Sequence, residues 1–166
     1  MVVLGVDPGT ATTGYGVVRK TGDRLEVVSQ GAILTKSGLP ATERLLSIYR
    51  ELDKILGDYQ PDVLVIERLF FAKNETTALA VGRAAGVILL LAAQKGLKVE
   101  EYTPLEVKQA VVGYGAAEKR QVQYMVQRIL GLTEPPKPDD VADALALCIC
   151  HANSAKLRGL RERPAR

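Results

Sequence analysis

Residues 1–18, MVVLGVDPGTATTGYGVV, carry the pattern that decides the fold. An apolar run at residues 2–6 ends in an aspartate, Asp7, and a glycine-punctuated turn separates it from a second apolar run that begins at Gly14. These runs and a third at residues 25–34 predict three strands joined by short turns of the hairpin type. A carboxylate that ends an otherwise apolar strand needs an explanation, and the rest of the chain supplies one.

Helical and strand patterns follow one another after residue 41. Apolar residues recur at helical spacing from Thr42, and VLVIE at residues 63–67 is typical of a strand buried on both faces of a sheet. Thr103, Pro104 and Glu106 form a capping box with proline at the first helical position. Further elements are expected at residues 76–95 (helix), 97–102 (strand), 103–113 (helix), 117–131 (helix) and 139–154 (helix). This order predicts an α/β fold with a mixed five-stranded sheet flanked by helices.

Length and composition favour one globular domain. The chain has 166 residues and is 47% hydrophobic, enough for one well-filled core. The longest apolar run, residues 84–93, is about half the ~20 residues that a membrane span requires, and no basic leader precedes an apolar segment. We therefore expect a cytoplasmic protein with no membrane partner. A net charge of +3 is too small to establish nucleic-acid binding by itself.

The cysteines and the histidine do not form a metal-binding pattern. Cys148 and Cys150 stand two residues apart in an apolar helix, and the chain has no second cysteine pair to complete a site. We interpret both as small buried residues. His151, the only histidine, is assigned no functional role.

Asp143 is the carboxylate hardest to explain as a surface residue. Its neighbours in VADALALCIC carry no other charge, and a helix that is apolar all round is a buried one. Asp140 lies three residues earlier, on the same helical face. A role at the helix N-terminus suits Asp139 well but leaves Asp143 without a partner.

Asp7 and Glu67 raise the same question, because each ends an apolar strand where sites form in α/β sheets. Together with Asp140 and Asp143 they would repel one another unless a hard divalent cation neutralised them. Carboxylate oxygens without histidine or cysteine suit Mg²⁺, with Mn²⁺ as a substitute. Two ions about 4 Å apart could activate a water and stabilise the leaving oxygen of a phosphodiester. The alternative is four unrelated solvated carboxylates.

Three cations are candidates for phosphate binding. Lys119 and Arg120 fall in the first turn of their helix, where the helix dipole disfavours cations unless an anion compensates. Lys108 is a weaker candidate, because an ordinary solvated lysine would explain it equally well.

The stretch after Glu67 contains both phenylalanines of the chain, Phe70 and Phe71. They could anchor the loop in the core. Alternatively they act as a wedge or stacking platform, as in proteins that unstack DNA. We include both, with Lys73 from the same stretch, among the candidate DNA-binding residues.

Four ordered motifs together resemble the RuvC family of bacterial Holliday junction resolvases. They are DPGT followed by TGYGVV in residues 7–18, VIERLFFAKN at 65–74, VKQAVVGYGAAEKRQV at 107–122 and DDVADALALC at 139–148. The resemblance covers nearly the whole chain up to about Ser154. Their combination with matching separations is far more specific than any single motif.

The resemblance implies an RNase H-like fold and a homodimer that binds four-way junction DNA. It implies paired symmetric nicks in two strands of like polarity, by magnesium-dependent hydrolysis with two ions per subunit, in recombination and repair. Partners would be the RuvA and RuvB branch-migration proteins. Some members carry histidine where this chain has Asp140. By resemblance the metal ligands are Asp7, Glu67, Asp140 and Asp143, the catalytic lysines are Lys108 and Lys119, and the junction-contacting phenylalanine is Phe70.

Two features bear on assembly and boundaries. Gly82 and Gly86 place small residues along one face of the helix at 76–95, so another backbone could approach closely, either from a second subunit or from the protein's own sheet. We expect a nuclease domain at residues 1–154 and a flexible basic tail at 155–166 with Arg158, Arg161 and Arg163.

Two other functions share parts of this pattern. DPGTATTGYG also resembles the phosphate loop of actin-like ATPases and sugar kinases, but those need a second lobe that this chain lacks. A related RNase H-like enzyme acting on RNA, or an inactive junction binder, would share the fold.

Overall fold

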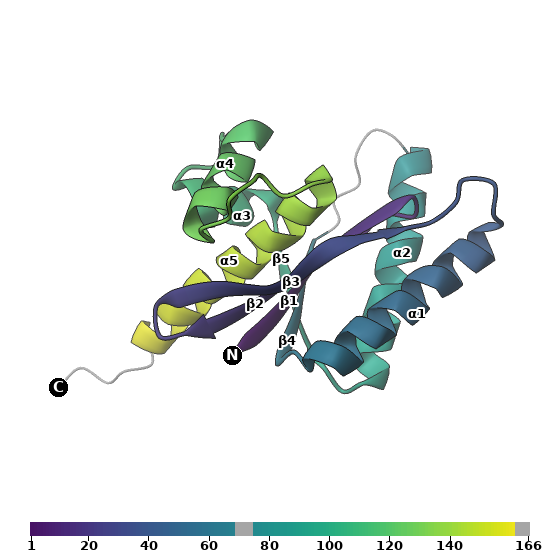
Figure 1. Cartoon of the computed structure of the whole chain (residues 1–166), viewed down its shortest axis with the longest axis horizontal. Coiled ribbons are helices and arrows are strands. Elements are labelled where there is room, and N and C mark those ends of the chain that lie inside the picture. Colours follow the sequence, from purple (N-terminus) through teal and green to yellow (C-terminus); the bar gives the residue numbers. More distant parts are fainter. Residues whose placement is uncertain (69–74, 162–166) are drawn as a thin grey trace.

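A five-stranded mixed sheet organises the chain (Figure 1). The computed structural model describes residues 1–68 and 75–161, leaving aside the side chains of 75–77 and 155–161. The strands are β1 (Val2–Asp7), β2 (Thr12–Thr21), β3 (Arg24–Leu34), β4 (Val63–Glu67) and β5 (Lys98–Tyr102). Their order across the sheet is β3-β2-β1-β4-β5. The predicted α/β fold is confirmed.

The strand pairing follows from the length of each connection. β1, β2 and β3 pair antiparallel through short turns, as the sequence predicts. β4 and β5 join β1 in parallel, because a helix separates each of them from the preceding strand. In this register Val6 lies opposite Ile66, and Asp7 lies opposite Gly14.

Helices cover both faces of the sheet (Figure 1). One face carries α1 (Ala41–Tyr59) and α2 (Glu75–Gln94), whose apolar sides form a core with β1 and β4. The other carries α3 (Pro104–Val112), α4 (Lys119–Ile129) and α5 (Asp139–Arg161). α5 is apolar all round over its first half because it lies between the sheet and the pair α3 and α4.

Helix boundaries agree closely with the sequence pattern. The capping box at α3 is present, since the Thr103 hydroxyl accepts from the Glu106 backbone N–H and the Glu106 carboxylate accepts from the Thr103 N–H. α5 continues beyond Ser154 through Arg161. The division into a domain and a flexible tail at residue 154 stays a prediction.

Glycines let α5 approach the sheet closely. A Cβ added at Gly5 of β1 would lie 2.1 Å from the carbonyl oxygen of Ala144. A Cβ added at Gly14 of β2 would lie 2.0 Å from the carbonyl oxygen of Asp140. Only glycine permits these contacts, and they hold the first turns of α5 against the ends of β1 and β2.

The cysteines and the histidine are part of the core, as expected. Burial raises the pKa of Cys148 to about 12, so its thiol stays neutral and unreactive. His151 is buried, and its Nδ1 lies 2.9 Å from the Tyr102 hydroxyl. Among the described helices, none is long and apolar enough to span a membrane.

Candidate functional site

Two of the predicted carboxylates end neighbouring parallel strands. β1 and β4 run side by side, and Asp7 and Glu67 are their last residues. The pairing of Val6 with Ile66 brings both carboxylates to the same edge of the sheet. This is the edge where sites form in sheets of parallel strands.

The other two carboxylates come from the first turns of α5. The Asp140 carbonyl sits over Gly14, and Gly14 pairs with Asp7 across β1 and β2. Asp143, one turn further, lies on the face of α5 that looks toward this edge, and its side chain is 33% exposed. The close approach allowed by Gly14 therefore brings α5 to Asp7.

Electrostatic coupling shows that the four carboxylates are neighbours. Burial, and after it the negative charges of Asp143, Asp140 and Glu67, raise the pKa of Asp7 to about 7, and the opposing effect of Lys119 is smaller. An aspartate that is hard to ionise at neutral pH, surrounded by other carboxylates, indicates a site that favours a cation. Carboxylates from β1, β4 and α5 therefore lie near one another, and their role as metal ligands stays a prediction.

Lys108 of α3 lies beside this group. Burial raises the pKa of Glu67, the Asp143 charge raises it further, and Lys108 opposes the shift. A lysine that acts on Glu67 in this way is close to the carboxylates. The structure therefore places Lys108 next to the cluster.

Lys119 is the first residue of α4, and its side chain pairs with two carboxylates of α5. Its Nζ lies 3.2 Å from Asp143 Oδ2 and 3.3 Å from Asp139 Oδ2. Partial burial lowers the Lys119 pKa, but the two carboxylates outweigh it and the pKa is raised. For Asp143, burial raises the pKa, Lys119 lowers it, and the net shift is upward. Lys119 is therefore a cation at the start of α4 that pairs with two carboxylates of α5.

The carboxylates are close together but do not form a finished coordination shell. No three His, Cys, Asp or Glu side chains among the described residues converge tightly enough to hold a metal ion. The ion pair with Lys119 offsets part of the negative charge of Asp143. A set of carboxylate oxygens without nitrogen or sulfur ligands fits a hard cation of the Mg²⁺ type.

Of the remaining predicted site residues, the structure describes only Arg120. Arg120 is exposed at the start of α4, next to Lys119. Phe70, Phe71 and Lys73 lie outside the described residues. A depression between β3 and α1, lined by Tyr15 and Glu51 among others, contains none of the predicted site residues.

Asp139 makes a contact that its place in the sequence does not indicate. Its position favours a role at the helix N-terminus, and its carboxylate also pairs with Lys119. Residues 119 and 139 are brought together by the packing of α4 on α5, so no local pattern could have indicated the pair.

Comparison with known proteins identifies relatives over almost the whole chain. The family model for crossover junction endodeoxyribonuclease RuvC matches residues 3–151. The crossover junction endodeoxyribonuclease RuvC of Syntrophomonas wolfei is 53% identical over 165 residues, covering 99% of this chain and 96% of the relative.

Solved structures agree with the sequence comparison. Thermus thermophilus RuvC superposes with a TM-score of 0.88 at 37% identity, covering 95% of this chain and 97% of that protein. T. thermophilus RuvC in complex with a Holliday junction substrate gives a TM-score of 0.89 at 38% identity, with 95% and 96% covered. The predicted RNase H-like fold is confirmed.

Proposed function

Because the chain belongs to the crossover junction endodeoxyribonuclease RuvC family, we propose that it resolves Holliday junctions by hydrolysing phosphodiester bonds. The proposal is supported by four carboxylates, Asp7, Glu67, Asp140 and Asp143, which lie near one edge of the sheet, and by Lys119, which pairs with Asp143. The reaction would place two symmetric nicks in strands of like polarity, in cytoplasmic recombination and repair.

The four carboxylates would hold the metal. The family is one of metal-dependent nucleases, and the oxygen-only donor set favours Mg²⁺, two ions per subunit, with Mn²⁺ as a substitute. When bound, the metal supplies an activated water and stabilises the leaving oxygen. Asp7, with its pKa near 7, accepts a cation in place of its proton. Metal binding by Asp143 would free Lys119 from one of its two partners.

The two lysines would act on the scissile phosphate. Lys119 stands among the carboxylates, and Lys108 lies beside Glu67. Each is positioned to stabilise the charge that grows on the phosphate in the transition state. Neither is needed as a nucleophile, because water performs that role.

DNA contacts would extend from this centre. Arg120 follows Lys119 and is exposed, so a phosphate near the cut site can reach both. Phe70, Phe71 and Lys73 follow β4 directly in sequence and are proposed to contact the junction.

A homodimer would present two such sites to the junction. A Cβ added at Gly82 or Gly86 of α2 meets no described atom within 4 Å, so these glycines do not pack on the protein's own sheet. Leu79 and Leu90 flank them along the same helix and are each 56% exposed. An open stripe of glycine and leucine suits a second copy of the helix. RuvA and RuvB remain the proposed partners in branch migration. Residues 155–166 remain the proposed basic tail.

Cleavage of defined substrates tests the proposed function. We expect a four-way junction to be cut with Mg²⁺ and left intact with a chelator. An RNA:DNA hybrid and a linear duplex should be cut far more slowly. Preferential cleavage of the hybrid would identify an RNA-directed enzyme. Binding of the junction without cleavage would identify an inactive junction binder, and tight binding of ATP would identify a phosphate-loop protein.

A further inference from the structure

The outer face of α4 combines exposed cations with an exposed aromatic ring. Arg120, Tyr124 and Arg128 follow one another at intervals of four residues, so they lie along one side of the helix. All three are exposed, and Tyr124 is 58% exposed. We call Arg120, Tyr124 and Arg128 the α4 stripe. The inner face of the same helix, with Val122 and Val126, packs into the core.

Neighbouring acidic residues do not account for the α4 stripe. Residues 119–133 contain three cations and no aspartate or glutamate. Neither Arg120 nor Arg128 forms an ion pair with any carboxylate in the described part of the chain. The helix dipole favours Arg128 in the last turn but opposes Arg120 in the first. Stabilisation of the helix alone therefore does not explain why cations stand at both of its ends.

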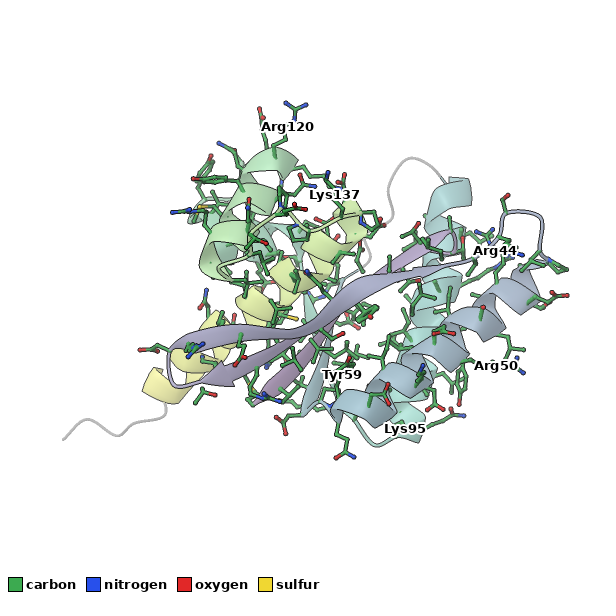
Figure 2. All side chains as sticks on the ribbon, viewed as in Figure 1. Arg44, Arg50, Tyr59, Lys95, Arg120 and Lys137 are labelled. Atoms are coloured by element: carbon green, nitrogen blue, oxygen red, sulfur yellow. The ribbon has the colours of Figure 1, made fainter. Side chains whose placement is uncertain are left out.

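The position of α4 connects the stripe to the carboxylate cluster. Lys119, the first residue of the helix, contacts Asp143. Arg128 lies nine residues further, about 13 Å along the axis at 1.5 Å per residue. A duplex arm that lies along the axis of α4 would extend over roughly four base-pair steps of 3.4 Å in that distance. Figure 2 shows Arg120 directed into solvent at α4, on the opposite side of the molecule from Arg50 of α1.

We propose that the α4 stripe binds the phosphate backbone of a duplex arm about four base pairs outward from the cut site. Two guanidinium groups would contact phosphates, and the Tyr124 hydroxyl would donate a hydrogen bond to a phosphate oxygen between them. The inference deepens the proposed function and rests on it. Duplex DNA is the occupant that the charge of the stripe and its continuity with Lys119 favour.

Junctions with native and with neutralised arms test this inference. Affinity would be measured by fluorescence anisotropy with a chelator present, on junctions with arms of roughly 15 base pairs. In the neutralised junction, uncharged methylphosphonates replace the phosphates around the fourth step of 3.4 Å from the cut site. On native arms Arg128→Ala should bind severalfold more weakly and lower the slope of log affinity against log salt by about one. The double variant Arg120→Ala with Arg128→Ala should lower that slope by about two. Tyr124→Phe should weaken binding without changing the slope, because it removes no charge.

Neutralised arms and a matched variant give the controls. On neutralised arms Arg128→Ala should bind as the unmodified protein does, because the phosphate charge that it contacts is missing. Arg50→Ala, which removes the same charge from the other side of the molecule, should change neither affinity nor slope on either substrate.

Two results would overturn the inference. Unchanged affinity and slope for Arg128→Ala on native arms would leave an acidic protein as the occupant of the stripe. Equal losses on native and neutralised arms would show that Arg128 contacts the crossover instead. Failure of the proposed function would show differently, because the unmodified protein would then not prefer junctions over linear duplex.

Discussion

At the scale of single residues, Asp143 is the clearest test of the carboxylate cluster. Asp143→Asn should lower the cleavage rate by at least about a hundredfold, because a metal ligand is lost. Junction affinity should be kept or increased, since one charge that repels phosphate is removed. Single-turnover cleavage and anisotropy measure the two effects. Asp58→Asn, an exposed carboxylate of α1, is the control, and normal cleavage by Asp143→Asn would show that Asp143 is not a ligand.

Lys119 is predicted to act mainly on the rate. Lys119→Ala should slow cleavage on the order of 10²-fold or more, because a charge aimed at the reacting phosphate is lost. Affinity should fall by less than about tenfold, since binding rests on many phosphate contacts. Lys54→Ala removes an exposed lysine from α1 and should affect neither. Equal losses of rate and affinity in Lys119→Ala would make it an ordinary binding residue.

At the scale of elements, the contact of α5 with the sheet controls the site. Gly5→Ala should reduce the free energy of unfolding by about 1–3 kcal/mol or more, because its Cβ would meet the Ala144 carbonyl at 2.1 Å. Gly57→Ala in α1 meets no described atom and should add about 0.5–1 kcal/mol through helix propensity. Urea unfolding measures both. Gly5→Ala with parental stability would mean that α5 can move away from the sheet at little cost.

At the scale of the whole molecule, the open face of α2 predicts an isologous dimer. Gly86→Glu should give a soluble, folded monomer that no longer makes paired nicks, because the charge would be buried between two copies of the helix. Sedimentation and circular dichroism measure assembly and folding. Gly57→Glu, the same change on α1, should remain a dimer. An unmodified protein that is monomeric at micromolar concentration, free and on junction DNA, would contradict the proposal.

Much of the fold was predictable because it depends on local patterns. The apolar runs at β1 and β4, the helical spacing of α1 and the capping box at Thr103 involve residues close together in the chain, so the sequence indicates them directly. The end of α5 was harder to predict from the sequence, because no residue at Ser154 stops a helix and the observed helix continues to Arg161. Residues 70, 71 and 73 lie outside the described residues, so their roles rest on the motif alone.

The sequence by itself determined which side chains are the candidates for the chemistry, because Asp7, Glu67 and Asp143 each interrupt an apolar pattern that burial would otherwise complete. Only the tertiary structure decided how they meet. Gly14 lets α5 rest on β2 beside Asp7, and the packing of α4 on α5 joins Lys119 to Asp139 and Asp143. Contacts between residues far apart in the chain depend on the crossing of whole elements, and no local spacing specifies that crossing.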